Sequence, residues 1–201
     1  MTRIGRVAAV LSTLVATGAA FAACNPAPNC TTIKANYADA PVKNTSRANA
    51  EKAVWCLTND QRAAAGVAAL TFNSVLNGTA RKHAEDAVTR QWWTDNADPH
   101  VNPDGKGPAD RVLAAGYCPN PTSWKVAENV YRGWGTPLQT PRTAVTWWMG
   151  STLHRNTILD PTLKDLGVGV TLGAPRPPKP GEPNPLPDAA VFVQNFGACT
   201  N

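Results

Sequence analysis

The chain has 201 residues, of which 43% are hydrophobic, and its 19 basic and 14 acidic side chains give a net charge of +5. This length is enough for one domain with its own hydrophobic core. The basic residues are scattered instead of forming Lys/Arg runs with interleaved aromatic residues, which argues against a nucleic-acid partner.

The first residues have the pattern of a secretory signal peptide. Arg3 and Arg6 precede the uncharged run 7–22, which ends in the small-x-small cleavage signal 20–22. The run is too short for a comfortable membrane span, and no second long apolar stretch follows it. We therefore predict that residues 1–23 are removed and that the mature chain has no transmembrane segment.

The chain contains five cysteines, which an exported protein would carry into an oxidising compartment, so disulfides are expected. They are Cys24, Cys30, Cys56, Cys118 and Cys199. Their number is odd, so one cysteine is left over, and spacing alone does not fix the pairing of the others.

Cys24 stands at the predicted cleavage boundary, where two interpretations remain open. It is either the lipid-modified first residue of a cell-envelope lipoprotein or a cysteine in a loose N-terminal tail. The residues before it form an imperfect lipobox, because Phe21 stands where leucine is usual. We predict a secreted protein, with the lipoprotein anchored through Cys24 as the alternative.

Residues 24–45 are rich in Pro, Asn and Thr and are expected to form an irregular N-terminal tail. Apolar residues at three-to-four spacing then predict a helix from about Ser46, and Gly66 is suited to end it. Three further helices are expected, beginning at Asn73 and covering 109–115 and 141–153.

Three β-strands are expected in the second half of the chain, at 125–131, 166–172 and 189–196. Between the last two, seven of the fourteen residues in 174–187 are Pro. Such a segment cannot pair in a central sheet, so it should form an exposed, polyproline-like loop joining two adjacent strands. Helices first and paired strands last predict a mixed, layered α+β fold.

Six stretches of the sequence, taken in order, match the motifs of one family. They are 56–62 with Gly66 and Leu70, 103–105 with 108–111 and 115–117, 127–129, 148–149 with 154–159, 166–170, and 193–197. Together they resemble the CAP superfamily in its bacterial form, the SCP-like domain of cysteine-rich secretory, antigen 5 and pathogenesis-related 1 proteins. The resemblance implies a CAP domain over residues 46–201, built as a three-layer α-β-α sandwich with a central cleft.

The resemblance also implies a site. The family's cleft is lined by two histidines and, in many members, by two acidic residues that sometimes hold a divalent metal. His100, His154 and Glu128 match three of these positions, while the second acidic position falls on Ser151. Two imidazoles and a carboxylate can bind Zn²⁺, but Ser151 cannot replace a carboxylate charge. The alternative is that the histidines only hydrogen-bond buried groups and that Glu128 braces a loop.

We expect His100, Glu128 and His154 to converge, with Ser151 facing the same space. Without a metal, the carboxylate should raise the pKa of at least one of the two histidines. His83 lies on the apolar stripe of the helix that follows Asn73, and we expect it to be a packed, hydrogen-bonded histidine instead of a ligand.

Three functions remain open. The first is a secreted, monomeric, non-catalytic binding module that holds a lipid, a peptide or an envelope fragment in the cleft. The second is a metal-assisted, peptidase-like hydrolase using His100, His154 and Glu128. The third is a structural envelope protein with a vestigial cleft. The incomplete acidic pair and the absence of a Gly-x-Ser-x-Gly or His-Glu-x-x-His motif favour the first.

The resemblance finally suggests how the cysteines pair. Bacterial relatives with a cysteine in the first-helix motif often carry one after the Gly-Tyr pair as well, which implies a Cys56–Cys118 disulfide. Cys30–Cys199, which would tie the N-terminal tail to the last strand, is the second expected pair.

Overall fold

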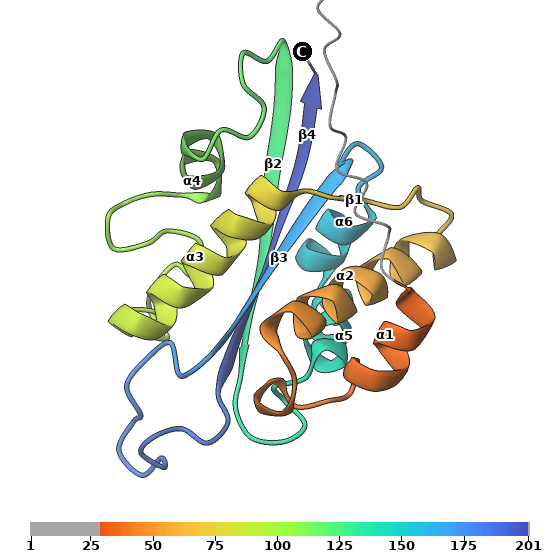
Figure 1. Cartoon of the computed structure of the whole chain (residues 1–201). Helices are drawn as coiled ribbons and strands as arrows, with labels where there is room; N and C mark the ends of the chain where they lie inside the picture. The colour runs from red at the N-terminus through yellow and green to blue at the C-terminus, as the bar shows by residue number, and fades with distance from the viewer. Residues whose placement is uncertain (1–28, 201) are drawn as a thin grey trace, which may run out of the picture.

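A four-stranded β-sheet in the order β1-β3-β4-β2 forms the middle layer of the fold. The computed structural model describes residues 29–200 and places this sheet between two layers of helices (Figure 1). The strands are β1 (Thr71–Phe72), β2 (Ser123–Gly133), β3 (Asp165–Leu172) and β4 (Ala190–Thr200). β4 pairs antiparallel with both β3 and β2, and β1 pairs parallel with β3. The three predicted strands are confirmed, and β1 is a short addition.

One helical layer consists of α3 (Ser74–Arg90) and α4 (Pro108–Ala114). α3 starts where predicted, because the side chain of Asn73 accepts the backbone N–H groups of Val75 and Leu76. An alanine face of α3 then packs against valines of β2 and β4, which fixes this helix on the sheet.

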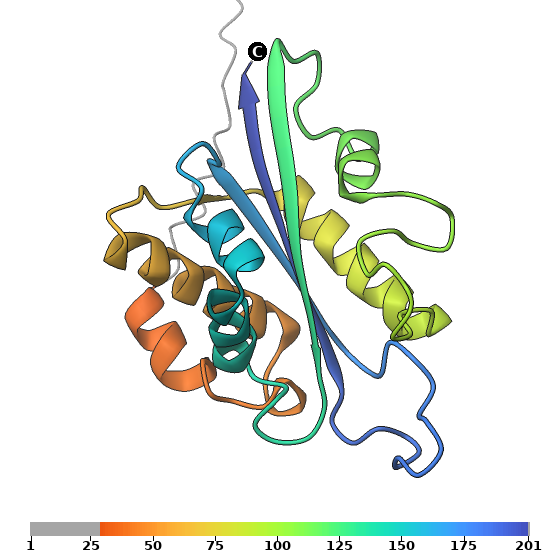
Figure 2. The ribbon, with the colours of Figure 1, turned by 180° about the vertical axis from the view of Figure 1, so that it is seen from behind.

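The opposite layer consists of α2 (Arg47–Ala64), α5 (Pro141–Gly150) and α6 (Thr152–Leu159). The largest apolar cluster of the described residues lies between these helices and the sheet, and it includes the fully buried Trp148. The mixed architecture confirms the predicted three-layer α-β-α arrangement (Figure 2).

The helix predicted over 141–153 is interrupted. Ser151 has an extended backbone, with φ −98° and ψ 125°, so α5 ends before it and α6 begins after it. His154 therefore lies in the first turn of α6 and not at the end of one long helix. This break places the side chains of Ser151 and His154 next to each other.

The prediction of an irregular tail over 24–45 is wrong for residues 29–45, the part that the structure describes. Helix α1 (Cys30–Tyr37) and the 3-10 helix η1 (Val42–Asn44) occupy much of it. None of the residues of α1 is buried, so the sequence carries no apolar stripe that would have predicted a helix. The predicted signal peptide and Cys24 lie outside the described residues.

Both predicted disulfides are wrong. The structure contains Cys30–Cys56 and Cys118–Cys199, with Cα–Cα distances of 5.5 and 5.4 Å. Cys30 reaches Cys56 because α1, which was not expected, packs beside α2. Cys118 follows α4 and lies beside the end of β4, because β4 continues past its predicted end at 196 to Thr200.

The Pro-rich segment joins β3 to the adjacent β4, as predicted, but it is not simply an exposed loop. Arg176 is only 3% exposed and pairs with Glu182 at 2.7 Å. Its guanidinium also lies 5.0 Å from the ring centre of Trp134. The backbone N–H of Trp93 donates to Pro175 at 3.0 Å, so the loop is fastened to the body of the protein.

No helix between residues 29 and 200 has both the length and the apolar character that crossing a lipid bilayer requires.

Candidate functional site

Glu128, in the middle of β2, anchors a buried polar cluster on the α3–α4 side of the sheet. Its side chain is only 1% exposed. One carboxylate oxygen, Oε2, lies 2.6 Å from Nη2 of Arg111, and the other, Oε1, accepts a hydrogen bond from Nδ1 of His100 at 2.9 Å. Such partners are needed because an unpaired buried charge is strongly destabilising.

Arg111 fixes the loop that carries His100. It lies on α4, which begins with Pro108 in its first turn. Nη1 of Arg111 donates to the backbone carbonyl groups of His100 at 2.8 Å and of Lys106 at 2.7 Å. One guanidinium group thus holds both Glu128 and the loop above it.

Asn195 of β4 completes the surroundings of the carboxylate. Its amide group lies 2.9 Å from Oε2 of Glu128, and the neighbouring groups assign the amide nitrogen to that side. In this orientation the amide oxygen accepts from Oγ1 of Thr79 and from the backbone N–H of Ala80, both at 3.1 Å. Donors therefore occupy both oxygens of Glu128.

His83 approaches the same carboxylate but does not bond to it. Nε2 of His83 donates to the carbonyl of Pro99 at 2.8 Å and lies 3.9 Å from Oε1 of Glu128. The ring packs against Trp92, with 5.5 Å between ring centres, and burial lowers its pKa below the ordinary 6.5. The packed, hydrogen-bonded histidine predicted from the helical stripe is confirmed.

His100 is the ring of this cluster that solvent reaches, with 35% of its side chain exposed. The hydrogen bond to Glu128 raises the pKa of His100 above 6.5, against the opposing effect of partial burial. Because Nδ1 is held by Glu128, Nε2 is the ring atom that can meet a ligand. At mildly acidic pH His100 presents a cation there.

His154 lies on the other side of the sheet. Its Nδ1 is 2.8 Å from Oγ of Ser151, and its backbone carbonyl accepts from Nδ2 of Asn129 at 3.2 Å. The ring packs on Trp147, with 4.9 Å between ring centres. Burial lowers the pKa of His154, and the nearby charge of His100 lowers it further.

The two histidines flank one strand of the sheet. Glu128 and Asn129 are consecutive residues of β2, so their side chains point to opposite faces. Glu128 holds His100 on one face, and Asn129 holds the start of α6, with His154, on the other. The structure thus brings His100 directly to Glu128 and His154 directly to Ser151, and it places the two pairs on either side of β2.

The family model described as "CAP: Cysteine-rich secretory protein family" matches residues 56–196. The chain belongs to the CAP family. This match covers the strands and helices that carry the whole candidate site.

The CAP chain also has a curated relative, an uncharacterized protein of Bacillus subtilis (strain 168) called YkwD. The two are 32% identical over 120 residues, which are 59% of this chain and 41% of YkwD. The CAP chain thus spans about two-fifths of the length of that relative.

Two solved structures resemble the CAP chain over 78% of its length. One is an extracellular SCP-domain protein from Bacillus anthracis str. Ames, with 17% identity, a TM-score of 0.55 and 44% of that chain covered. The other is an outer surface protein of Borrelia burgdorferi, with 15% identity, a TM-score of 0.58 and 97% covered. At these identities the likeness concerns the fold, and it confirms the predicted CAP architecture.

The residues of this candidate site do not fit the divalent metal that the resemblance implied. Donors already occupy both oxygens of Glu128, and Arg111 supplies a positive charge at the carboxylate. Across residues 29–200, no three side chains of His, Cys, Asp or Glu are grouped so that they could hold a metal ion. Glu128 acts here as the brace of the His100 loop.

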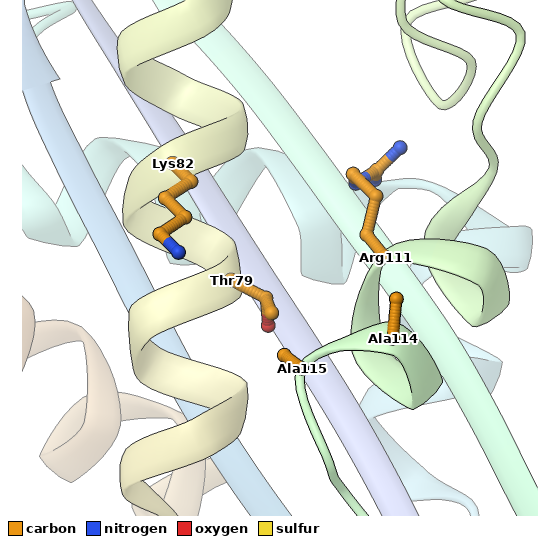
Figure 3. Close-up of a pocket in the computed structure, with 5 residues that line it drawn as sticks. All are labelled: Thr79, Lys82, Arg111, Ala114 and Ala115. Carbon is orange, nitrogen blue, oxygen red and sulfur yellow. The ribbon is translucent and has the colours of Figure 1, made fainter.

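A separate pocket of about 250 Å³ opens between α3 and α4 behind this cluster (Figure 3). It is lined by Thr79, Lys82, Arg111, Ala114 and Ala115. Thr79 points toward Ala115 across the space between the helices, whereas the guanidinium of Arg111 is directed away from Ala115. The pocket therefore shares Arg111 with the Glu128 cluster but is lined by neither His100 nor His154.

Sequence reasoning did not single out Arg111, Asn195 or Trp147 as part of the site. The adjacent amides Gln194 and Asn195 in the middle of a mostly apolar strand were a detectable signal, because buried amide groups need polar partners. Arg111 and Trp147 carried no comparable signal, since an arginine or a second tryptophan on a helix is ordinary surface composition. Only the folded arrangement shows that they touch His100 and His154.

Proposed function

We propose that this CAP-domain protein is an exported binding module without catalytic activity, with a ligand cleft over β2 between His100 and His154. The observation that carries the proposal is the state of Glu128. A general base or metal ligand must present a carboxylate lone pair to the cleft, but the Glu128 side chain is buried and its charge is shared between Arg111, His100 and Asn195. What remains for a ligand is one imidazole on each side of the strand.

The Ser151–His154 contact does not by itself make a nucleophile. The two residues lie three apart at the start of one helix, where side-chain contacts of this kind are common. A serine nucleophile needs a base that a third group orients, and no carboxylate of the described residues bonds to His154. This arrangement supports binding over hydrolysis.

Export is supported by the two disulfides, which persist in oxidising compartments, and by the leader-like residues 1–23. The similar structures described above are named as extracellular and outer-surface proteins. We propose a secreted protein, with attachment through a lipid on Cys24 as the alternative. Intact-mass measurement of the mature protein from its native envelope distinguishes the two.

The chemistry of the cleft favours a ligand with both polar and apolar parts. His100 offers a hydrogen-bond donor that is readily charged, while Trp147, a residue that is 49% exposed, offers an aromatic ring. Peptides, lipids and envelope fragments share this combination. Native mass spectrometry of the exported protein, with His100→Gln as the cleft variant and Lys52→Gln, an exposed residue of α2, as the surface control, tests the proposal. A bound species that the cleft variant loses and the control keeps is expected.

The same sample separates the other two functions. Stoichiometric zinc together with cleavage of a peptide or ester panel would establish the metal-assisted hydrolase and contradict the proposal. A protein that binds no species and cleaves none would be a structural envelope protein with a vestigial cleft.

A further inference from the structure

β2 is an edge strand whose second side is unpaired. Among the described strands it pairs only with β4, in an uninterrupted register of eleven residues from Ser123 to Gly133. It has no β-bulge and no proline, two devices by which natural proteins block an exposed edge. Figure 2 shows β2 as the outermost strand, with α4 and α6 on opposite sides of the sheet.

The register determines which backbone groups of β2 point outward. The backbone N–H of Gly173 donates to the carbonyl of Ala189 at 2.7 Å. In the β3–β4 ladder, the odd-numbered residues of β4 therefore direct their backbone N–H and C=O groups toward β3. The even-numbered residues of β4 then direct their backbone groups toward β2. The hydrogen bond from the backbone N–H of Thr122 to the carbonyl of Thr200, at 2.9 Å, agrees with this. Their partners in β2 are odd-numbered.

The even-numbered residues of β2 therefore direct their N–H and C=O groups away from the sheet. Trp124, Val126 and Glu128 are the three in the first half of the strand. No hydrogen bond to their backbone groups is found within residues 29–200. The next outward-facing residue, Val130, cannot offer its carbonyl to a ligand, because that carbonyl already accepts the indole N–H of Trp148 at 3.0 Å.

Solvent reaches this row of backbone groups. Residues Ser123 to Lys125 are exposed, the next three are half-buried, and Asn129 is buried. Glu128 is informative, because its side chain is 1% exposed while the residue as a whole is half-buried. The exposed part of Glu128 is therefore its backbone.

We propose that an extended peptide adds to this edge as a fifth strand, pairing with the backbone of Trp124, Val126 and Glu128 and ending at the two histidines. Strand addition of this kind gives affinity through main-chain hydrogen bonds and specificity through alternate side chains. Three outward-facing residues at every second position match a segment of about six residues. The inference rests on the proposed binding function and names its ligand class.

The surroundings of the edge suit a peptide better than a lipid. Successive side chains of an added strand would face the His100 side and the His154 side in turn. At the far end, an open pocket of about 240 Å³ gives room for the first residue. It is lined by Ser123, Trp124, Lys125, Thr162, Ala198 and Thr200. A lipid chain would leave the six backbone groups without partners, which costs free energy.

The test uses a pool of acetylated hexapeptides of randomised sequence, incubated with the mature protein. Bound members are identified by mass spectrometry, and the strongest is examined by amide hydrogen exchange. Hydrogen exchange at the amides of Trp124, Val126 and Glu128 should slow by about tenfold or more on binding. Those of Ala127 and Asn129, already bonded to β4, serve as internal controls and should not change.

A variant and a matched peptide check the same geometry. Val126→Pro removes an outward N–H group without removing a hydrogen bond to β4. It should lower the affinity for the selected hexapeptide by about tenfold or more. Because this variant also alters packing, the hexapeptide is additionally made with N-methyl groups on alternate residues. Methylation of one set of alternate residues should abolish binding and methylation of the other should not.

The outcomes distinguish this inference from the proposed function. A selected hexapeptide that leaves the three amides unchanged would show a cleft ligand without strand addition and overturn the inference alone. The same holds if no hexapeptide is enriched while another species co-purifies with the wild type and not with His100→Gln. If neither is found, both fall.

Discussion

At the scale of single residues, the site depends on Glu128. Replacing it by Gln removes the negative charge that pairs with Arg111 and His100. The Arg111 side chain, which is only 11% exposed, then keeps its positive charge without that partner. Removing one partner of a buried pair costs about 3 kcal/mol or more, so Glu128→Gln should lower the free energy of unfolding by that amount. Urea unfolding measures it.

The matched control is Glu85→Gln, which breaks the Arg47–Glu85 pair. Both of these side chains are 44% exposed, and surface pairs contribute below about 1 kcal/mol. Equal losses in the two variants would mean that Glu128 is not the brace we describe.

The buried His83 predicts how stability depends on pH. Burial lowers the pKa of His83 in the folded protein below 6.5, so the unfolded chain binds more protons. Folding stability should therefore fall as the pH drops through 6.5. In His83→Gln, the decrease in Tm between about pH 7.5 and about pH 5 should be smaller than in the wild type.

His100 gives the opposite sign and serves as the control. Its raised folded-state pKa contributes stability that is complete below 6.5 and is lost as the pH rises through the folded value. His100→Gln should therefore lose more Tm than the wild type on acidification. Parallel Tm profiles for all three proteins would contradict both assignments.

At the scale of elements, the two disulfides should contribute different amounts to the free energy of unfolding. Cys30–Cys56 closes a separation of 26 residues and Cys118–Cys199 one of 81. Loop entropy assigns them about 3.5 and about 4.5 kcal/mol, so removing the second pair with serines should cost about 1 kcal/mol more. Denaturant unfolding of the two double-serine variants tests the order.

Loss of the Cys30–Cys56 bond should also have a local signature. α1 buries none of its residues, so without the bond it should detach while the core remains folded. Far-UV circular dichroism should lose a short helix, and the near-UV signal of the buried tryptophans should persist. Collapse of the near-UV signal would show that α1 supports the core.

The elements show what the sequence could and could not predict. α2, α3 and α4 begin where capping residues or Pro108 predict, because their signals are local. α1 was missed because a helix without a buried face has no apolar period. The cysteine pairs were wrong because they depend on where that helix packs.

The candidate site divides in the same way. His100, His154 and Glu128 came from motif resemblance, and the structure joins His100 to Glu128. The sequence left the role of Glu128 open between metal ligand and loop brace, because the choice depends on Arg111 arriving from α4. The separation of the histidines by β2 follows from strand alternation, which matters only once the register is known.

At the scale of the whole molecule, the distance between α3 and the sheet is set by glycine. A Cβ atom at Gly169 would lie 2.3 Å from the backbone of Ala80 and of Arg81. Because these are backbone atoms of a packed helix, Gly169→Ala should destabilise the protein by about 1–3 kcal/mol. Thermal unfolding measures the loss.

Gly78, on α3 itself, is the control with the opposite sign. A Cβ atom there meets nothing within 4 Å, and alanine favours a helix over glycine by about 1 kcal/mol. Gly78→Ala should therefore raise Tm. A Gly169→Ala variant as stable as the wild type would mean that α3 can move off the sheet.

The position of β4 between β3 and β2 has a consequence for biosynthesis. Neither neighbour pairs with the other, so the sheet cannot assemble until residues Ala190–Thr200 have left the ribosome. We therefore expect the nascent chain to lack its complete central sheet during translation. A chain truncated after Ala189 should accordingly show no cooperative thermal transition. A folded truncation product would mean that the helical layers can form before the sheet that they cover.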